Sequence, residues 1–417
     1  MDKLVIEGGS RLNGTVAASG AKNAALPLLF STLLAEGEHV FKNVPFLKDI
    51  ESACQLLETL GCECEHKDYT LKVRVQKPKT FEASYDLVRK MRASILCLGP
   101  LVAKYGEARV SLPGGCAIGT RPIDLHLFAM QALGTELNVD AGYVNAKTAG
   151  LKGTKILFEN VTVGGTENAL MAAVLAKGTS TIENAAQEPE ITNLADYLNK
   201  MGAKIKGAGT RVITVEGVSK LTPSTHSVLP DRIEAGTLLI AGAITGGDVT
   251  VTNCRPEHFG ATIEKMREAG FNITMGKDSV RVHPLAVWNG VDVTTAPFPG
   301  FATDLQAQFM ALMIVANGTT VITETIFENR YMHVQELVRL NADITLKGQT
   351  AIVKGNRANL TGAPVMATDL RASACLVLAG LVAKGETVVN RIYHLDRGYE
   401  GLEKKLSHLG AKIKREA

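Results

Sequence analysis

The residues best suited to chemistry lie in one loop, residues 111–124. Cys116 follows Pro113 and two glycines in that loop, and Arg121 stands five residues further on. Because a thiol near a guanidinium can have a lowered pKa, this arrangement predicts a reactive cysteine. The alternative is that Cys116 is a small buried side chain, the commoner state of a free cysteine. Its glycine neighbours, in place of Leu, Val or Ile, favour the reactive interpretation.

A second set of charged residues stands where apolar helices are expected to begin. Five of them lie 14 or 15 residues before a glycine that closes such a helix: Lys22, Arg92, Arg232, Asp304 and Arg371. A cation at the positive end of a helix is mildly unfavourable, so its recurrence predicts that an anion binds at these helix starts. Helix capping is the alternative. It suffices for Asp231, Thr303 and Asp369, but it does not explain lysine or arginine.

Other polar residues near these helix starts are candidates for acid–base work. Asp304 opens a helix among apolar neighbours and could act as a base if burial raises its pKa. Arg330 and Arg397 each follow a β-rich run, where a loop arginine could reach the same region, although each taken singly is more typical of the surface. The sequence does not choose among the neighbouring histidines, which are His126, His333 and His394.

The elements that position these residues must belong to a large globular chain. Its 417 residues are too many for one ordinary core and predict two or three domains. Hydrophobic residues make up 46% and charged residues 21%, which is typical of a soluble protein. With 45 basic and 42 acidic residues and no long run of either sign, nothing indicates affinity for nucleic acid or an anionic membrane. An anionic ligand must therefore be bound by a few placed cations.

The same sequence predicts a cytoplasmic protein without membrane insertion. Residues 1–7 do not resemble a signal peptide, and the longest apolar runs, such as residues 374–383, are about half the length of a membrane span. Seven cysteines without framework spacing indicate a reducing compartment. We expect Cys97 and Cys375 in the core. The spacing of Cys62 and Cys64 fits a strand better than a metal site, so no metal is predicted.

Two glycine markers recur along the chain with the same period. Apolar helical segments close on glycine at intervals of 67 to 72 residues: Gly37, Gly106, Gly178, Gly247, Gly318 and Gly385. A second helix ends at intervals of 68 to 73 residues: Gly61, Gly134, Gly202, Gly270, Asn341 and Gly410. The agreement predicts six units of about 70 residues, each built as strand, helix, strand, helix and strand pair.

The first helix of each unit is predicted to lie inside its domain. Alanine and leucine crowd nearly every face of residues 169–175 and 374–383, so these helices should be buried all round. Helices enclosed by sheet are the reverse of a TIM barrel. Residues 221–230 contain two prolines and little periodicity and are the best candidate linker after the third unit. The sequence therefore predicts an α/β protein with two domains of three repeats each.

Five long motifs give the chain a family resemblance. They are Ser-Gly-Ala-Lys-Asn-Ala-Ala (19–25), Leu-Pro-Gly-Gly-Cys-Ala-Ile-Gly (112–119), Thr-Asp-Leu-Gln-Ala-Gln (303–308), Phe-Glu-Asn-Arg (327–330) and Thr-Asp-Leu-Arg-Ala-Ser (368–373). With them the chain resembles the UDP-N-acetylglucosamine 1-carboxyvinyltransferases of the EPSP synthase superfamily, from Met1 to the last repeat. The resemblance implies a two-domain inside-out α/β barrel with three repeats per domain. Residues 22–229, with the Cys116 loop, would form one domain, residues 1–21 and 230–417 the other, and the active site would lie in the cleft between them.

The resemblance also implies a reaction. The family adds the 3′-hydroxyl of UDP-N-acetylglucosamine to C2 of phosphoenolpyruvate and then expels phosphate, the first committed step of peptidoglycan synthesis, on which cell wall biogenesis, cell shape and cell division depend. By this likeness Cys116 is the general acid, the thiol of the pyruvate adduct and the target of fosfomycin, and Asp304 is the base. Lys22, Arg121 and Arg397 would hold the phosphate, with Arg371 and Arg397 near the carboxylate.

The remaining site residues are implied in the same way. Arg92 and Arg330 would support the closed site, and Asn23 would contact substrate. The sugar nucleotide would lie along Arg121, Pro122, Ile123, Asp124 and Leu125, with Thr162, Val163, Gly164 and Ile326 near it. This chain has Asn160 where some relatives carry lysine. No metal or organic cofactor is implied, the substrates would be the only partners, and a monomer is expected.

Two other functions fit parts of the pattern. 3-Phosphoshikimate 1-carboxyvinyltransferase shares the expected fold and the enolpyruvyl donor, but the Pro-Gly-Gly-Cys loop speaks against it. A repeat protein that binds sugar nucleotides without catalysis would leave Cys116 a structural residue.

Overall fold

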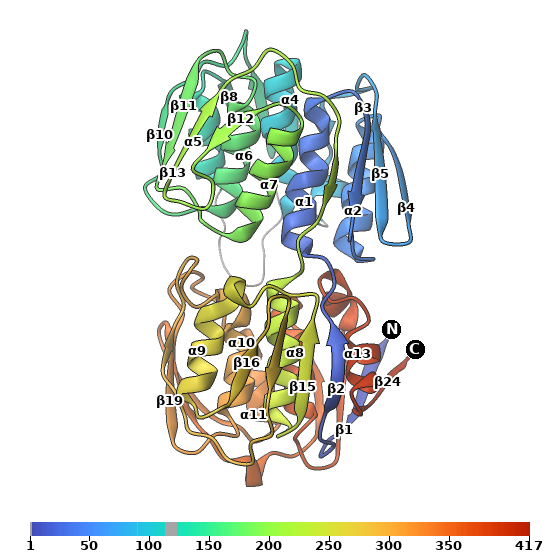
Figure 1. Cartoon of the computed structure of the whole chain (residues 1–417), viewed down its shortest axis with the longest axis vertical. Helices are drawn as coiled ribbons and strands as arrows, with labels where there is room; N and C mark the ends of the chain where they lie inside the picture. Colours follow the sequence, from blue (N-terminus) through green and yellow to red (C-terminus); the bar gives the residue numbers. More distant parts are fainter. Residues whose placement is uncertain (1, 90, 113–122) are drawn as a thin grey trace. The chain divides into compact units, whose positions relative to one another are not determined.

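The computed structural model describes residues 2–89, 91–112 and 123–417. These residues form two compact units: residues 20–112 with 123–229, and residues 2–19 with 230–417. Each unit contains three repeats and three four-stranded sheets among its described residues (Figure 1). The predicted fold, six α/β repeats with three in each half, is confirmed.

The unit of residues 20–229 carries the first three repeats. The first contains α1 (Lys22–Ser31), the 3-10 helix η1 (Thr32–Leu34), β3 (Gly37–Lys42), α2 (Lys48–Thr59), β4 (Glu63–Lys67), β5 (Thr70–Val75) and, from the end of the unit, β14 (Thr225–Ser227). The second contains β6 (Glu82–Ala83), α3 (Tyr85–Val88), η2 (Arg92–Cys97), α4 (Leu98–Tyr105), β7 (Glu107–Ser111), α5 (Asp124–Ala132), β8 (Glu136–Asp140) and β9 (Tyr143–Lys147). The third contains β10 (Lys155–Leu157), α6 (Val163–Ala173), β11 (Thr179–Glu183), α7 (Pro189–Lys200), β12 (Lys204–Lys206) and β13 (Val212–Glu216).

The other unit carries the last three repeats. The fourth contains β2 (Asn13–Ala17), α8 (Arg232–Ile244), β15 (Asp248–Thr252), η3 (Pro256–Phe259), α9 (Gly260–Glu268), β16 (Ile273–Met275) and β17 (Ser279–Val282). The fifth contains β18 (Val293–Thr294), α10 (Thr303–Met313), β19 (Thr319–Thr323), α11 (Met332–Arg339), β20 (Asp343–Lys347) and β21 (Thr350–Lys354), followed by η4 (Arg357–Asn359). The sixth contains β22 (Pro364–Met366), α12 (Leu370–Gly380), β23 (Glu386–Asn390), η5 (Ile392–Arg397), α13 (Leu402–His408), β24 (Lys412–Glu416) and β1 (Lys3–Glu7).

All six sheets follow one pattern of pairing. In the third repeat the strand order is β10-β11-β13-β12, with β10 parallel to β11 and the other neighbours antiparallel. The strand before the core helix and the strand after it are thus parallel neighbours, as a βαβ crossover requires, and a hairpin completes the sheet.

Three sheets are completed by strands from distant parts of the chain. β14 pairs with β3, β2 pairs with β15, and β1 lies between β23 and β24. The predicted linker, residues 221–230, was therefore wrong in part, because it contains β14. Two prolines flank this three-residue strand and hid its pattern.

The helices predicted to be buried form the cores. α8, α10 and α12 pack against one another in one unit, and α4 packs against α6 in the other. Every residue of α12 from Arg371 to Gly380 is buried. The glycine markers end helices as expected: Gly61, Gly134, Gly202, Gly270, Asn341 and Gly410 all have positive φ.

Two further expectations concern cysteines and membranes. Cys97 and Cys375 are fully buried, as predicted, and Cys64 lies in β4 with Cys62 just before it. No helix among the described residues is both long enough and apolar enough to cross a bilayer.

Candidate active site

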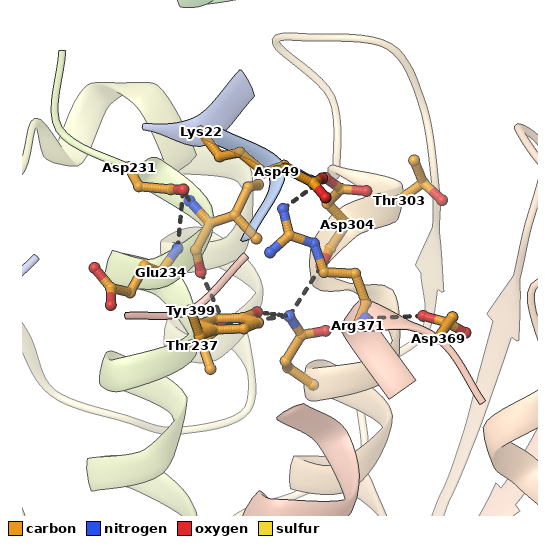
Figure 2. Close-up of polar contacts among 12 residues, drawn as sticks. Lys22, Asp49, Asp231, Glu234, Thr237, Thr303, Asp304, Asp369, Arg371 and Tyr399 are labelled. Carbon is orange, nitrogen blue, oxygen red and sulfur yellow. Dashed lines mark hydrogen bonds and ion pairs between the residues drawn. The ribbon is translucent and has the colours of Figure 1, made fainter. Parts of the chain in front are cut away.

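Asp304 lies at the centre of a charged cluster in the unit of residues 230–417. It is the second residue of α10, and its side chain is 26% exposed. Arg330 Nη2 donates to Asp304 Oδ1 at 2.7 Å, and Arg371 Nη2 donates to Oδ2 at 2.9 Å. The two arginine side chains are only 6% and 4% exposed, so both cations are nearly removed from water. Figure 2 shows the Arg371 guanidinium directed toward Asp304.

The electrostatics of Asp304 differ from the sequence expectation. Burial would raise the pKa of this carboxyl, but the charges of Arg371 and Arg330 and their hydrogen bonds hold the pKa well below its usual range. The expectation that burial raises the pKa was therefore wrong, because two arginines from other elements face the carboxylate. Asp304 is ionised in the free protein at neutral pH.

Arg371 lies at the start of α12 and has unused donor capacity. Asp369 caps this helix by accepting from the Arg371 and Ala372 backbone N–H groups, at 2.8 and 3.0 Å. The guanidinium lies over the Tyr399 ring, 5.3 Å from its centroid. The Arg371 Nη1 atom is buried, and it has no hydrogen-bond partner among the described residues. A buried, unused donor at a helix N-terminus indicates a place for an anion.

The polar network below Arg371 holds Tyr399 in place. The Tyr399 hydroxyl lies 3.0 Å from Thr237 Oγ1 and accepts from Gln308 Nε2 at 2.9 Å (Figure 2). These partners belong to α8 and α10. The ring that lies beside Arg371 is thus fixed by the two other core helices of its unit.

Arg397 and Ile326, also predicted site residues, lie in the same unit. Arg397 ends η5, the segment that precedes Tyr399, and is half-buried. Ile326 is half-buried in the segment between β19 and α11, and its backbone N–H donates to Glu324 Oε1 at 2.8 Å. Arg330 lies four residues further along this segment.

Lys22 is paired in the unit of residues 20–229. It is the first residue of α1, whose N-cap residue, Ala21, offers no side-chain hydrogen bond. Its Nζ lies 3.2 Å from Asp49 Oδ2, in the first turn of α2, and the side chains are 13% and 4% exposed. Asp49 therefore neutralises and orients this lysine. Asn23, the next residue of α1, is half-buried.

The same unit brings together two segments that were predicted to bind the sugar nucleotide. Ile123, Asp124 and Leu125 lie at the start of α5, and Thr162, Val163 and Gly164 lie at the start of α6. The two helices are in contact, and a Cβ added to Gly164 would lie 2.8 Å from His126 Cε1. Glycine is thus required for this close approach.

His126 and Arg92 connect these segments to the second repeat. Asn168 Nδ2 lies 2.8 Å from His126 Nδ1, while Asn168 Oδ1 accepts from the Gly99 N–H at 3.0 Å. Burial, with a smaller contribution from the Arg92 charge, lowers the pKa of His126 to about 4. His126 is therefore neutral at physiological pH.

Several sequence predictions about this region need correction. Arg92 begins the 3-10 helix η2, and the α-helix starts only at Leu98. The core helix of the third repeat begins at Val163, six residues before the apolar run of residues 169–175. Asp231 and Asp369 cap helices as predicted, but Thr303 does not, because Ala302 is the N-cap residue and the Thr303 hydroxyl bonds other side chains. Cys116, Arg121 and Pro122 lie outside the described residues.

Sequence reasoning missed three polar residues that support the site. Asp49 pairs with Lys22, Glu324 accepts the Ile326 N–H, and Tyr399 faces Arg371. The contacts of Asp49 and Tyr399 depend on tertiary packing, whereas that of Glu324 joins residues two apart in the chain. The one available signal was the polarity of Glu324 directly after the β-rich run of β19, a position typical of functional residues in α/β proteins.

Comparisons with known proteins show the family and the fold. Residues 6–406 match the family model of EPSP synthase (3-phosphoshikimate 1-carboxyvinyltransferase). The enolpyruvyl transferase NikO from Streptomyces tendae has a TM-score of 0.89 at 26% identity and covers 99% of this chain and 98% of its own. An EPSP synthase from Acinetobacter baumannii has a TM-score of 0.77 at 17% identity over 100% of both chains, which shows the fold alone. The fold is thus that of the enolpyruvyl transferases.

Closer relatives place the chain within that class. A UDP-N-acetylglucosamine 1-carboxyvinyltransferase from Bdellovibrio bacteriovorus is 68% identical over 412 residues, covering 99% of this chain and 100% of the relative. One from Myxococcus xanthus is 58% identical over 419 residues, covering 100% of both. The chain belongs to the family of UDP-N-acetylglucosamine 1-carboxyvinyltransferases. It is an enzyme, a transferase, so the interpretation as a repeat protein without catalysis is wrong.

Proposed function

We propose that the chain transfers the enolpyruvyl group of phosphoenolpyruvate to the 3′-hydroxyl of UDP-N-acetylglucosamine and releases phosphate. The observation that carries the proposal is a pair of arginines, one just before α11 and one at the start of α12, that both face a carboxylate at the start of α10. One carboxylate, Asp304, faces both Arg330 and Arg371, and Arg371 keeps a buried donor without a partner among the described residues. Such a cluster suits an anionic substrate and disfavours a neutral one.

The chemistry of this transfer assigns a task to each group. A proton must reach C3 of phosphoenolpyruvate, which leaves C2 electron-poor, and the sugar hydroxyl then bonds to C2 and gives up its proton. The tetrahedral adduct next expels phosphate, and loss of a C3 proton restores the double bond. Cys116 is proposed to deliver the first proton. Lys22, Arg121 and Arg397 are proposed to hold the phosphate, and Arg371 with Arg397 the carboxylate.

Asp304 can act as the base only when the bond between the sugar oxygen and C2 is already largely formed. Its pKa lies well below the usual range because two arginines face it, so it attracts protons weakly in the ground state. A hydroxyl that attacks an electron-poor C2 becomes strongly acidic as the bond forms. A weak, fixed carboxylate can then accept its proton without first losing its own ion pairs.

The sugar nucleotide is proposed to lie along the starts of α5 and α6 and near Ile326. α5 and α6 are in contact, and Gly164 approaches His126 in the first turn of α5, which supports a shared contact surface. Asn23 would contact substrate, while Arg92 and Arg330 would support the closed site. As part of the proposal, residues 22–229 and residues 1–21 with 230–417 act as the two domains, with the active site between them.

The proposal extends to the cellular role. The product would enter peptidoglycan synthesis in the cytoplasm, the thiol of Cys116 would form the pyruvate adduct and react with fosfomycin, and the protein would act as a monomer. Its two small-molecule substrates are the only ligands that the reaction requires.

One assay tests the proposed reaction. Phosphoenolpyruvate is supplied with either UDP-N-acetylglucosamine or shikimate 3-phosphate, and phosphate release is measured. We expect release only with the sugar nucleotide. Release only with the shikimate acceptor, or with neither, would contradict the proposal. In the same assay Cys116→Ser should lose most activity at neutral pH, because an alcohol is a far weaker acid than a thiol.

A further inference from the structure

Glu324 is a buried acid directly after β19 that accepts four hydrogen bonds. The residue is 1% exposed. Its Oε1 accepts from Thr295 Oγ1 at 2.9 Å and from the backbone N–H groups of Ile326 and Phe327 at 2.8 and 3.2 Å. Its Oε2 accepts from Thr303 Oγ1 at 2.8 Å. One side chain therefore ties the start of α10 to the segment that carries Ile326.

The Thr303 hydroxyl connects Glu324 to the charged cluster. Arg330 Nη1 lies 2.8 Å from Thr303 Oγ1, and a guanidinium can only donate. Since a hydroxyl has one hydrogen, Thr303 donates that hydrogen to Glu324 and accepts from Arg330. The other guanidinium nitrogen, Nη2, donates to Asp304 at 2.7 Å. The order of donation is thus fixed from Arg330 through Thr303 to Glu324.

The segment between β19 and α11 is held at both ends. Thr325 donates from its backbone N–H to Thr295 Oγ1 at 2.9 Å and from its hydroxyl to the Thr295 carbonyl at 2.6 Å. At the far end the Tyr331 hydroxyl donates to the Ile322 carbonyl at 2.7 Å. Because both ends of this segment are fixed, the rotamer of Arg330 depends on the two acceptors of its terminal nitrogens, Thr303 Oγ1 and Asp304 Oδ1.

We infer that Glu324 and Thr303 are positioning residues of the active site. They hold Arg330 against Asp304, and Glu324 also holds the Ile326 backbone. The inference rests on the proposed function, in which Asp304 accepts the sugar hydroxyl proton and Ile326 lies near the nucleotide. Glu324 therefore couples the place where the sugar nucleotide is held to the place where its proton is taken.

The two residues should have different kinetic signatures. Thr303→Val keeps the shape but removes the hydroxyl, so Arg330 loses its acceptor and Glu324 Oε2 its donor, while Glu324 Oε1 still holds the Ile326 N–H. We expect its kcat to fall about tenfold or more, with little change in KM for UDP-N-acetylglucosamine, because small displacements of reacting groups are costly. Thr303→Ser keeps the hydroxyl and should restore kcat to within about threefold of the wild type. Glu324→Gln should lower kcat and also raise KM for the sugar nucleotide, because it loosens Ile326 as well.

A matched control variant is available in β19, the strand that ends directly before Glu324. The buried Thr320 hydroxyl in β19 has no hydrogen-bond partner among the described residues, so Thr320→Val should leave both constants unchanged. If Thr303 and Glu324 act in series, the double variant should have a kcat no lower than that of Glu324→Gln alone. A wild-type kcat in Thr303→Val, or effects that multiply in the double variant, would overturn the inference.

A structural measurement separates this inference from the proposed reaction. Wild-type enzyme that releases no phosphate from the two substrates would refute the proposed function. A crystal structure of Thr303→Val still tests the positioning role in that case. We expect the Arg330 guanidinium to move away from Asp304, and an unchanged pair would refute the positioning role whether or not the enzyme is active.

Discussion

At the scale of single residues, the environment of Asp304 decides its chemistry. The sequence placed this carboxylate at a helix start among apolar residues, which alone would favour a protonated acid. The structure adds Arg330 and Arg371 within hydrogen-bond distance, and their charges outweigh the burial. The residue is thus a permanently charged acceptor that two cations hold in one orientation.

This balance predicts how the pH profile responds to Arg330. In the wild type the pKa of Asp304 lies well below its usual range, so its protonation should not limit kcat/KM above about pH 4. Arg330→Gln removes one cation and leaves the burial, so the pKa of Asp304 should rise. Because the base is inactive when protonated, the acid limb of kcat/KM for the sugar nucleotide should move to higher pH.

Arg330→Lys is the matched control for this prediction. It keeps the charge but loses the guanidinium fork, so its acid limb should stay close to that of the wild type even if kcat falls. The measurement is phosphate release between pH 4 and 9 for the three proteins. An Arg330→Gln profile with the wild-type acid limb would show that Arg330 does not control the charge of Asp304.

Residue roles were predictable where the chain repeats itself and not elsewhere. Lys22 and Arg371 stand at equivalent places in different repeats, so spacing alone located them at helix starts, as the structure shows. Glu324 stands six residues after a marker glycine, but no other repeat carries an acid at that offset, so spacing did not single it out. Lys22 lies 27 residues from Asp49, and Thr303 lies 21 residues from Glu324, so only the packed repeat brings each of these pairs into contact.

At the scale of elements, close helix contacts depend on glycine. In the core of the unit of residues 20–229, Gly99 of α4 faces α6, and its N–H donates to Asn168 Oδ1 at 3.0 Å. A Cβ at this position would lie 2.7 Å from the Asn168 carbonyl oxygen and 2.8 Å from Oδ1. The two helix backbones are therefore too close for any side chain at residue 99.

Gly99→Ala should destabilise the protein although alanine favours helices. The gain in helix propensity is about 1 kcal/mol, whereas overpacking a rigid core costs about 1 to 3 kcal/mol. We expect the thermal midpoint to fall by about 3 °C or more. Gly260→Ala is the control. Gly260 begins α9 with φ −54°, and a Cβ added there would have no neighbouring atom within 4 Å. It should leave the midpoint unchanged or raise it, and a Gly99→Ala protein as stable as the wild type would contradict the packing argument.

The elements themselves were largely predictable, and the errors have physical causes. Apolar helices and glycine ends gave the six repeats because both signals are local. The apolar run of residues 169–175 did not reveal that α6 begins at Val163, because Val163 and two glycines do not resemble a helix start. β14 was taken for linker because its pairing with β3 joins residues 225–227 to residues 40–42, a contact that no local pattern reveals.

At the scale of the whole molecule, the two units differ in how the chain builds them. The unit of residues 20–229 comes from one stretch, and its core shares no residue with the core of the other unit. The unit of residues 230–417 needs β1 and β2 from the amino-terminal segment, because β1 lies between β23 and β24 and β2 completes the sheet of β15. Among the described residues, one unit therefore takes no strand from outside residues 20–229, whereas the other needs strands from a distant segment.

The difference predicts which pieces fold alone. Residues 20–229 should form a folded protein with a cooperative thermal transition, since all three sheets and their core are present. Residues 230–417 should not, because they lack the fully buried Leu4 and Ile6 of β1. Burial of each such side chain contributes about 1.5 to 3 kcal/mol, and the lost strand pairing adds to this, against a total stability of about 5 to 15 kcal/mol for a domain.

The decisive variant restores the missing strands within one chain. The Asp231 N–H donates to the Ser19 carbonyl at 2.8 Å, so a short Gly-Ser linker can join residues 1–19 directly to residues 230–417. We expect this joined chain to regain native circular dichroism and a cooperative transition that residues 230–417 lack, because β1 and β2 again complete their sheets. If residues 230–417 fold equally well without the added segment, β1 is dispensable to its sheet. If the joined chain remains unfolded while residues 20–229 fold, the second unit depends on the first for its stability, and the two cores are not independent.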